Sequence, residues 1–238
     1  MYTVFQKEIA SFFGSLIGYL VMAVFLTGVG LFFWAFEGNV LEALYATLDP
    51  LFSYGPYFLL FLVPAITMRA FAEEAKTGTL ELLFTKPLTS WQVIGGKYLA
   101  ALFLIVFSLL PTIVYAITIW VLGSPQGNVD VGASIGSYIG LIAIGGIFAG
   151  IGLFTSALTD NQIVAFILGV FLCFICFVGF EYLSGIKVIT GFTAILVKLG
   201  IMEHYRSISR GVIDSRDMIY FLSFIAISLL ATRLVLRR

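Results

Sequence analysis

The side chains that could do chemistry are few in this sequence, and they form no catalytic set. Cys173 and Cys176 have the C-x-x-C spacing, which in a soluble protein indicates redox or metal chemistry. They lie in a long apolar run with no second cysteine pair and no nearby histidine, so packing between helices is the favoured interpretation. His204, the single histidine, follows Glu203 in a charged segment, and we interpret it as a surface residue. The sequence therefore predicts neither a catalytic site nor a metal site.

The string Gly95-Gly96-Lys97 is the nearest approach to a phosphate-binding loop. It lacks the first glycine at the required spacing, and a tyrosine stands where that loop needs Ser or Thr after the lysine. We therefore interpret Lys97 as a basic anchor at the edge of a membrane span. The chain is predicted not to be an enzyme and to bind no cofactor, which leaves any ATP and Mg²⁺ to a partner ATPase.

The composition predicts that the elements carrying these residues lie in a lipid bilayer. Hydrophobic residues make up 61% of the 238 residues and charged residues 11%, and the mean hydropathy is +1.08. A soluble domain has roughly 25% charged residues, so this chain has too little polar surface to face water. Its formal net charge of zero gives no reason to expect a nucleic-acid partner. The predicted fold class is all-α, a polytopic integral membrane protein.

Uncharged runs mark six predicted transmembrane helices, because a charge at the bilayer centre costs at least about 2.5–3.5 kcal/mol. The last run is short, but Asp217 and Arg233 at its ends can extend their side chains to the interface. A further apolar patch at 188–197 is too short to cross and is predicted to be re-entrant or interfacial. The first run exceeds one span, so residues 1–13 are assigned to an interfacial amphipathic helix. The six runs are 9–36, 50–68, 98–129, 131–159, 161–180 and 218–232.

Loop charges predict the orientation, since cytoplasmic loops are enriched in Lys and Arg. The segments 37–49 and 123–130 contain neither residue, whereas both ends of the chain and the segment 69–96 contain them. The segment 181–217 also contains Lys and Arg, which opposes this assignment. An even number of spans with both termini in the cytoplasm remains the prediction.

Glycine and proline indicate how the spans pack and bend. Gly132, Gly136 and Gly140 recur every four residues, a pattern that lets helix backbones approach closely in a membrane. Packing within the chain is favoured over a dimer seam, which stays open as the alternative. Pro64 and Pro111 lie inside the second and third spans and are predicted to kink them.

The segment 69–96, between the second and third spans, carries most of the charge predicted to be cytoplasmic. Helical composition continues past the second span to Lys76, and Gly78 then permits a sharp change of direction. A short helix is predicted at 79–84, and Pro87 ends it. The segment thus predicts a helix, a break, a short helix and a second break before the third span.

The short helix places Leu80, Leu83 and Phe84 on one side, an apolar knob suited to docking on a cytoplasmic partner. A plain interfacial linker helix explains the same pattern equally well. Thr89, with Gln92 three residues later, predicts a capping box at the start of the third span.

The string EAKTGTLELLFTKPL at 74–88 resembles the signature of permease subunits of type-2 ABC exporters. In that family the signature lies between the second and third of six helices, as it does in this sequence. The resemblance implies a connecting helix at 1–13, a coupling helix at about 79–84 that docks on an ABC ATPase subunit, and broken exofacial helices at 181–217. The residues that it implies in ATPase coupling, with their flanks, are Glu74, Gly78, Thr79, Leu80, Glu81, Leu83, Phe84 and Pro87.

Three further strings resemble the permease of the gliding-motility-associated ABC transporter: FFGS at 12–15, the stretch 156–165, and EHYRSISRGVID at 203–214. This match covers essentially the whole chain, so 1–238 is interpreted as a single ABC-2 type permease domain. It implies a dedicated ATPase subunit, a second permease or related membrane subunit as a dimer partner, and the bacterial inner membrane as the location. It does not identify the substrate.

The favoured function is that of the transmembrane permease subunit of an ATP-driven ABC exporter, in a gliding-motility-associated complex. The predicted spans hold no carboxylates like those that ion-coupled transporters place near the midplane, so ATP hydrolysis on another subunit is expected to supply the energy. A non-transporting structural or regulatory membrane component of a motility machine is the alternative. In the exofacial loop, Glu181, Arg210 and Gly211 form a candidate gate, although folding of the loop is their favoured role.

Overall fold

The structure is a computed structural model, and it describes residues 1–42, 45–81, 88–184, 197–211 and 214–236. All the regular elements within these ranges are helices. Six helical segments in them are long and apolar enough, by length and composition, to cross a membrane. The predicted fold class, all-α with six spans, is therefore confirmed. The six segments are Leu16–Trp34, Asp49–Lys76, Ser90–Leu122, Val131–Leu158, Gln162–Leu183 and Ser215–Leu236.

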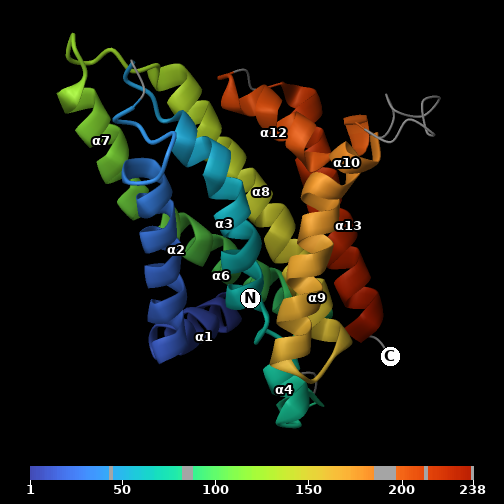
Figure 1. Cartoon of the computed structure of the whole chain (residues 1–238). Coiled ribbons are helices and arrows are strands. Elements are labelled where there is room, and N and C mark those ends of the chain that lie inside the picture. Colours follow the sequence, from blue (N-terminus) through green and yellow to red (C-terminus); the bar gives the residue numbers. More distant parts are fainter. Residues whose placement is uncertain (43–44, 82–87, 185–196, 212–213, 237–238) are drawn as a thin grey trace.

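Three of the spans are single helices and three are interrupted (Figure 1). The single helices are α2 (Leu16–Trp34), α8 (Val131–Leu158) and α13 (Ser215–Leu236). The second span contains α3 (Asp49–Thr67) and α4 (Ala72–Lys76), and the third contains α6 (Ser90–Leu109), the 3₁₀ turn η1 (Leu110–Thr112) and α7 (Ile113–Leu122). The fifth span contains α9 (Gln162–Phe174), the π-helical turn η2 (Ile175–Gly179) and α10 (Phe180–Ser184). Two helices outside the spans are α1 (Tyr2–Phe13) and α12 (Ile201–Ser209).

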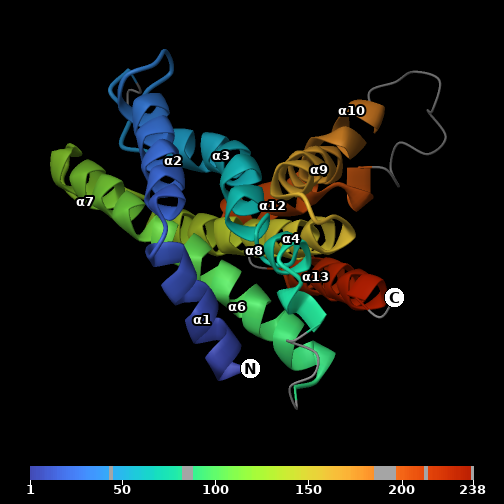
Figure 2. The ribbon, with the colours of Figure 1, turned by 90° about the horizontal axis from the view of Figure 1, so that it is seen from below.

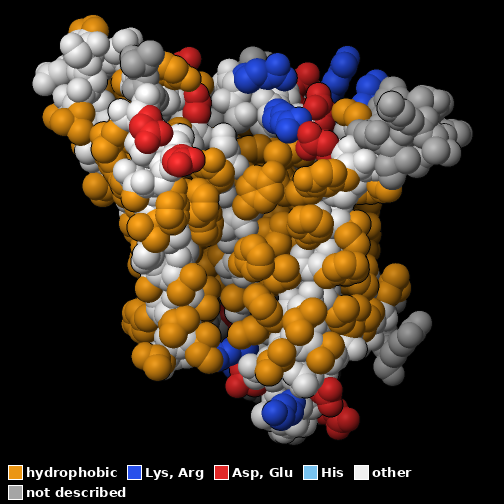
Figure 3. Space-filling view, in the orientation of Figure 1, with side chains coloured by type: hydrophobic (Ala, Val, Ile, Leu, Met, Phe, Trp, Pro, Cys, Tyr) orange, Lys and Arg blue, Asp and Glu red, His pale blue; other side chains and the backbone are white. Residues whose placement is uncertain are grey.

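Helix α8 is the centre of the bundle. It packs against α3, α6, α9, α12 and α13. In the most apolar stretch of 18 residues of α8, 72% is buried inside the protein. The corresponding share is only 17–33% for the spans that contain α2, α6, α9 and α13. These outer helices place their apolar side chains on the surface, and Figure 3 shows a broad hydrophobic band across the middle of the face in view. A band of this kind suits contact with lipid.

Glycines allow the neighbours of α8 to approach it closely. A Cβ atom at Gly136 would lie 2.8 Å from the carbonyl oxygen of Ile208 in α12, and one at Gly140 would lie 3.0 Å from the ring of Tyr205. At Gly150 a Cβ atom would lie 3.0 Å from a side-chain carbon of α13. These contacts are within the chain, so the prediction of intramolecular packing is confirmed at these glycines.

The bundle has two different ends, which we name the α1 end and the α12 end. In Figure 1, α1, α4 and the C-terminal end of α13 lie at the bottom, whereas α10, α12 and the far end of α7 lie at the top. Seen from below, α1 runs across the foot of the bundle and packs along α6 (Figure 2). The polar sites described below are at these two ends.

The two prolines predicted to kink the spans have different effects. At Pro111 the third span changes from α-helix to a 3₁₀ turn and back, so the predicted interruption is confirmed. Helix α3 continues through Pro64 and ends at Thr67. The chain then turns at 68–71, so the predicted continuous helix to Lys76 was wrong: the break comes before the short α4.

The last span is longer than predicted. Helix α13 begins at Ser215, because the carboxylate of Asp214 accepts a hydrogen bond of 2.9 Å from the backbone N–H of Arg216 near the start of the helix. The uncharged run began only after Asp217, so a count of apolar residues alone missed the first turn.

Candidate functional site

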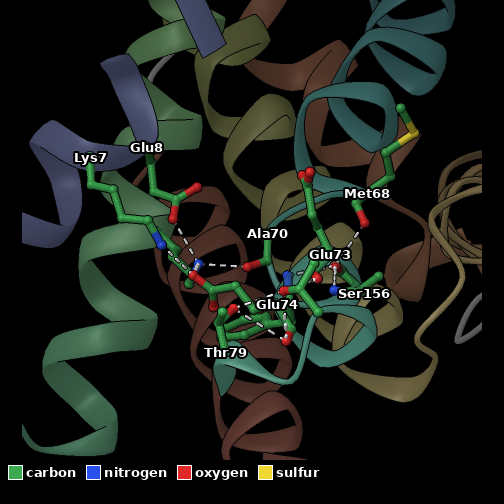
Figure 4. A network of polar contacts seen from close by, with 12 residues as sticks. Lys7, Glu8, Met68, Ala70, Glu73, Glu74, Thr79 and Ser156 are labelled. Atoms are coloured by element: carbon green, nitrogen blue, oxygen red, sulfur yellow. Dashed lines mark hydrogen bonds and ion pairs between the residues drawn. The ribbon is translucent and has the colours of Figure 1, made fainter. Parts of the chain in front are cut away.

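A partly buried ion-pair cluster at the α1 end joins three elements (Figure 4). The side chain of Lys97, in the second turn of α6, is only 1% exposed. Its ammonium nitrogen lies 2.7 Å from Oε1 of Glu8 in α1 and 3.1 Å from Oε1 of Glu74 in α4. It also donates to the carbonyl oxygen of Ala70 and lies 5.0 Å from the centre of the Phe71 ring. These contacts hold α1, α4 and α6 together.

Lys7 approaches the same carboxylate from α1. Its ammonium nitrogen lies 2.6 Å from Oε1 of Glu74, the oxygen that Lys97 also contacts. Burial alone would lower the pKa of Lys7, but the hydrogen bond to Glu74 and the attraction of nearby carboxylates outweigh it and raise that pKa. We call Lys7, Glu8, Glu74 and Lys97 the ion cluster. The interpretation of Lys97 as a membrane-edge anchor was wrong, because its side chain is buried among these partners.

A second polar contact fixes the break between α3 and α4. The hydroxyl of Ser156, in α8, accepts hydrogen bonds from the backbone N–H groups of Phe71 at 3.0 Å and Ala72 at 3.1 Å. It donates one of 2.9 Å to the carbonyl oxygen of Met68. Helix ends leave such backbone groups without partners, so this one hydroxyl satisfies three of them.

Part of the predicted coupling segment is described next to the ion cluster. Gly78 has a φ of +69°, a conformation that favours glycine, and the helical stretch at 79–81 follows it. Thr79 and Glu81 are exposed, whereas Leu80 is half-buried against the core cluster that contains Phe71. Leu80 therefore packs inward and does not project as part of a knob. The predicted coupling residues that lie outside the described ranges are Leu83, Phe84 and Pro87.

The third span begins as the sequence predicts. Thr89 accepts a hydrogen bond of 3.3 Å from the backbone N–H of Gln92, and the Gln92 side chain accepts one of 3.0 Å from the N–H of Thr89, so the capping box is confirmed. In the first turn of α6, the ring of Trp91 lies 4.9 Å from the guanidinium of Arg233. This contact ties the last turn of α13 to the α1 end.

At the α12 end, the candidate gate residues take part in different contacts. Glu181 forms an ion pair of 3.0 Å with Arg206, and both side chains are about half exposed. Arg210 donates its Nε–H to the carbonyl oxygen of Arg206 at 3.1 Å. Gly211 has a φ of +84°, and a Cβ atom there would lie 3.2 Å from the backbone of Ala133 in α8. Within the described residues, Glu181 is thus paired with Arg206 rather than with Arg210.

His204 forms a link that sequence reasoning missed. Its Nδ1 lies 2.7 Å from Oδ1 of Asp217 in α13, and its Nε2 donates to the carbonyl oxygen of Lys198 at 2.8 Å, because a carbonyl can only accept. The ring stacks on Tyr220 with a centroid distance of 3.9 Å. Its interpretation as a surface residue was wrong, since the side chain is only 17% exposed. Among the described residues, no group of three or more His, Cys, Asp or Glu side chains could hold a metal ion.

Comparison with known proteins agrees with this architecture. Residues 42–202 match the family described as ABC-2 family transporter protein. The chain is also 38% identical over 109 residues to the probable multidrug ABC transporter permease YbhR of Escherichia coli (strain K12), and equally to the protein of that name in Escherichia coli O157:H7. The alignment covers 46% of this chain and spans 28% of the length of each relative. Because the family match includes more than half of the residues and the fold has six apolar helices, the chain belongs to the ABC-2 family of transporter proteins and is a multi-pass membrane protein.

Proposed function

We propose that this chain is the transmembrane permease subunit of an ATP-driven ABC exporter, and that its α1 end receives the motion of an ABC ATPase subunit. Membership of the ABC-2 family supports the role of a membrane subunit. The observation that carries the coupling role is the ion cluster, in which Glu74 at the base of the coupling segment contacts both α1 and α6. A displacement of the coupling segment would therefore reach two elements at once.

In this proposal the chain converts movement rather than performing chemistry. ATP binding and hydrolysis by two ATPase subunits would shift the coupling segments of two paired permease subunits and change the opening between their spans. Other chains would provide the second permease or related membrane subunit and the ATPase. The ATPase would bind the ATP and its Mg²⁺. The substrate class is not part of the proposal.

The proposal also sets the location and orientation. The Lys and Arg residues at the ends of the chain and in 69–96 support a cytoplasmic α1 end with both termini on that side. The strings at 12–15, 156–165 and 203–214 support a place in a gliding-motility-associated complex of the bacterial inner membrane.

The test replaces Glu74 with glutamine in the chain purified together with its ATPase subunit. We expect the complex to assemble, but its stimulation of ATP hydrolysis to fall about tenfold, because glutamine carries no charge to hold Lys7 and Lys97. Glu73→Gln is the matched control. Glu73 is an exposed residue of the same short helix and forms no ion pair among the described residues, so hydrolysis should be unchanged.

Stimulation that survives Glu74→Gln at full strength would overturn the coupling role of the ion cluster. Failure of any ATPase to purify with the chain would overturn the permease assignment itself. Vesicles containing the complete complex then separate transport from the alternative function. ATP-dependent movement of labelled material supports an exporter, and hydrolysis without movement supports a mechanical or structural component.

A further inference from the structure

Three basic residues at the α1 end, Arg69, Lys76 and Arg233, have no counter-charge in the part of the chain that the structure describes. The two lysines and two glutamates of the ion cluster balance one another. Arg69, in the turn after α3, forms no ion pair or hydrogen bond with a described side chain, and its buried Nε has no acceptor. The nearest carboxylate along the chain, Glu73, is exposed and also forms no ion pair there. Because buried polar groups normally have a hydrogen-bond partner, we expect the guanidinium of Arg69 to bind an acceptor from another molecule.

Arg69 lines a small polar hollow where α1, α3 and α6 meet. The other polar residues that line it are Glu8 and Ser11 of α1, Thr67 of α3 and Lys97 of α6, and the carboxylate of Glu8 is paired there with Lys97. The cavity volume is about 40 Å³. A volume of this size has room for roughly three water-sized groups, so it suits the oxygen atoms of a headgroup rather than a protein side chain with its backbone. Figure 3 shows basic and acidic side chains gathered at the lower edge of the hydrophobic band, where this end of the bundle lies.

An apolar groove lies between α2, α3 and α9. Its cavity volume is about 180 Å³, and its lining is entirely apolar, with Leu20 and Val24 from α2, Phe61 and Ala65 from α3, and Phe166 from α9. Ala65 lines the groove and Arg69 lines the hollow. The two positions are four residues apart in the chain, with Ala65 in the last turn of α3 and Arg69 in the turn that follows it.

We propose that Arg69 and this groove bind an anionic glycerophospholipid from the leaflet at the α1 end. Phosphate oxygens accept hydrogen bonds from the Arg69 guanidinium, whose planar fork matches phosphate geometry, and an acyl chain occupies the groove. The groove is part of the membrane-spanning surface, where Phe61 is 57% exposed, so lipid is the molecule that covers it. Because the ion cluster is neutral as a set, the charge of Arg69 favours a headgroup with a net negative charge.

The test measures lipid binding to the full chain by native mass spectrometry in detergent. The probes are phosphatidylglycerol and phosphatidylcholine with the same acyl chains. The chain should bind phosphatidylglycerol about tenfold more tightly, and Arg69→Gln should remove that preference. Arg69→Lys should keep part of it, because lysine retains the charge but not the fork. Arg216→Gln is the matched control: Arg216 is exposed at the α12 end, and its loss should change nothing.

A second variant tests the groove with Arg69 intact. Ala65→Leu narrows the groove and should weaken the binding of both lipids alike, so the proposal stays testable even if circular dichroism shows that the Arg69 variants do not fold. Inorganic phosphate is the competing probe. If phosphate alone displaces phosphatidylglycerol, the site binds an ion and the lipid proposal is overturned. Equal binding of the two lipids, or an unchanged preference in Arg69→Gln, would overturn it as well.

Discussion

The ammonium group of Lys97 is fully satisfied by its surroundings. It has three N–H donors, and three acceptors face it: the carboxylates of Glu8 and Glu74 and the carbonyl oxygen of Ala70. Burying a charge is tolerated only where such contacts offset the loss of hydration. The second carboxylate oxygen of Glu74 is buried without a partner, so this residue depends on the contacts of its Oε1.

Removing the buried lysine should therefore destabilise the protein strongly. We expect Lys97→Met to lower the free energy of unfolding by about 3–5 kcal/mol, because two carboxylates lose their shared counter-charge in a buried site. Thermal unfolding of the detergent-solubilised chain measures this. The variant that also carries Glu8→Gln and Glu74→Gln should recover part of the loss. A Lys97→Met chain as stable as the parent would show that the cluster contributes nothing.

Only part of this site could be predicted from the sequence. Glu74 could be singled out because it begins a string that resembles a family signature. Lys7 and Lys97 could not, because 67 positions separate Lys7 from Glu74 and 89 separate Lys97 from Glu8. Ion pairs between residues so far apart in the chain form only when the helices pack, and no local sequence pattern predicts them. The contact of His204 with Asp217 likewise depends on where α12 meets α13.

At the scale of elements, the turn at 68–71 is held from outside by α8. The hydroxyl of Ser156 serves as the partner of backbone groups on both sides of the turn. Helix α3 ends at Thr67, three residues after Pro64, and the short α4 begins at Ala72. The sequence pattern stayed helical here, so the break could not be predicted from composition.

We expect Ser156→Ala to loosen this turn. The backbone N–H groups of Phe71 and Ala72 lose their shared acceptor, at a cost of about 1–3 kcal/mol. Hydrogen exchange at these two amides should become faster, while exchange in the middle of α8 should stay unchanged. Ser134→Ala, a half-buried position in the first turn of α8, is the control. Equal exchange at Phe71 in the parent and in Ser156→Ala would contradict the assignment.

The glycines of α8 give a second prediction at this scale. Gly140→Val should lower the free energy of unfolding by about 1–3 kcal/mol, because the new side chain would meet the rigid ring of Tyr205. Gly132→Val should be far better tolerated, since a Cβ atom there would meet only a side-chain oxygen of Asp130 at 3.4 Å. Thermal unfolding of the two variants in the same detergent makes the comparison. A similar loss in both would contradict the packing argument.

The spans themselves were predictable because lipid imposes a strict rule on charge. All six uncharged runs contain a helix, and the interruption at Pro111 follows from the missing N–H of proline. The ends of the spans were less predictable. Helix α13 includes Arg216 and Asp217 in its first turn, because Asp214 caps it and His204 holds Asp217. A charge therefore marks the edge of the membrane, not the end of a helix.

At the scale of the whole molecule, polar contacts are concentrated at the two ends and an apolar band separates them (Figure 3). This arrangement makes the proposed orientation testable by labelling. In a background with Cys173→Ala and Cys176→Ala, a membrane-impermeant maleimide should label Glu203→Cys in intact cells and Thr79→Cys only in inverted vesicles. Both positions are exposed in the structure. Labelling of Thr79→Cys in intact cells would reverse the orientation and remove the proposed ATPase contact.

The turn at 68–71 has a mechanical consequence for a motor that acts at the α1 end. Because α3 stops at Thr67, the second span is not a continuous rod that could carry a push along its own length. A displacement of α4 would instead pass to two neighbouring helices. One branch is the contact of Glu74 with Lys97 in α6, and the other is the hydrogen bond of Met68 with Ser156 in α8. Loss of the ion-cluster branch alone should therefore leave a weak response through Ser156, and only the loss of both branches should abolish the coupling.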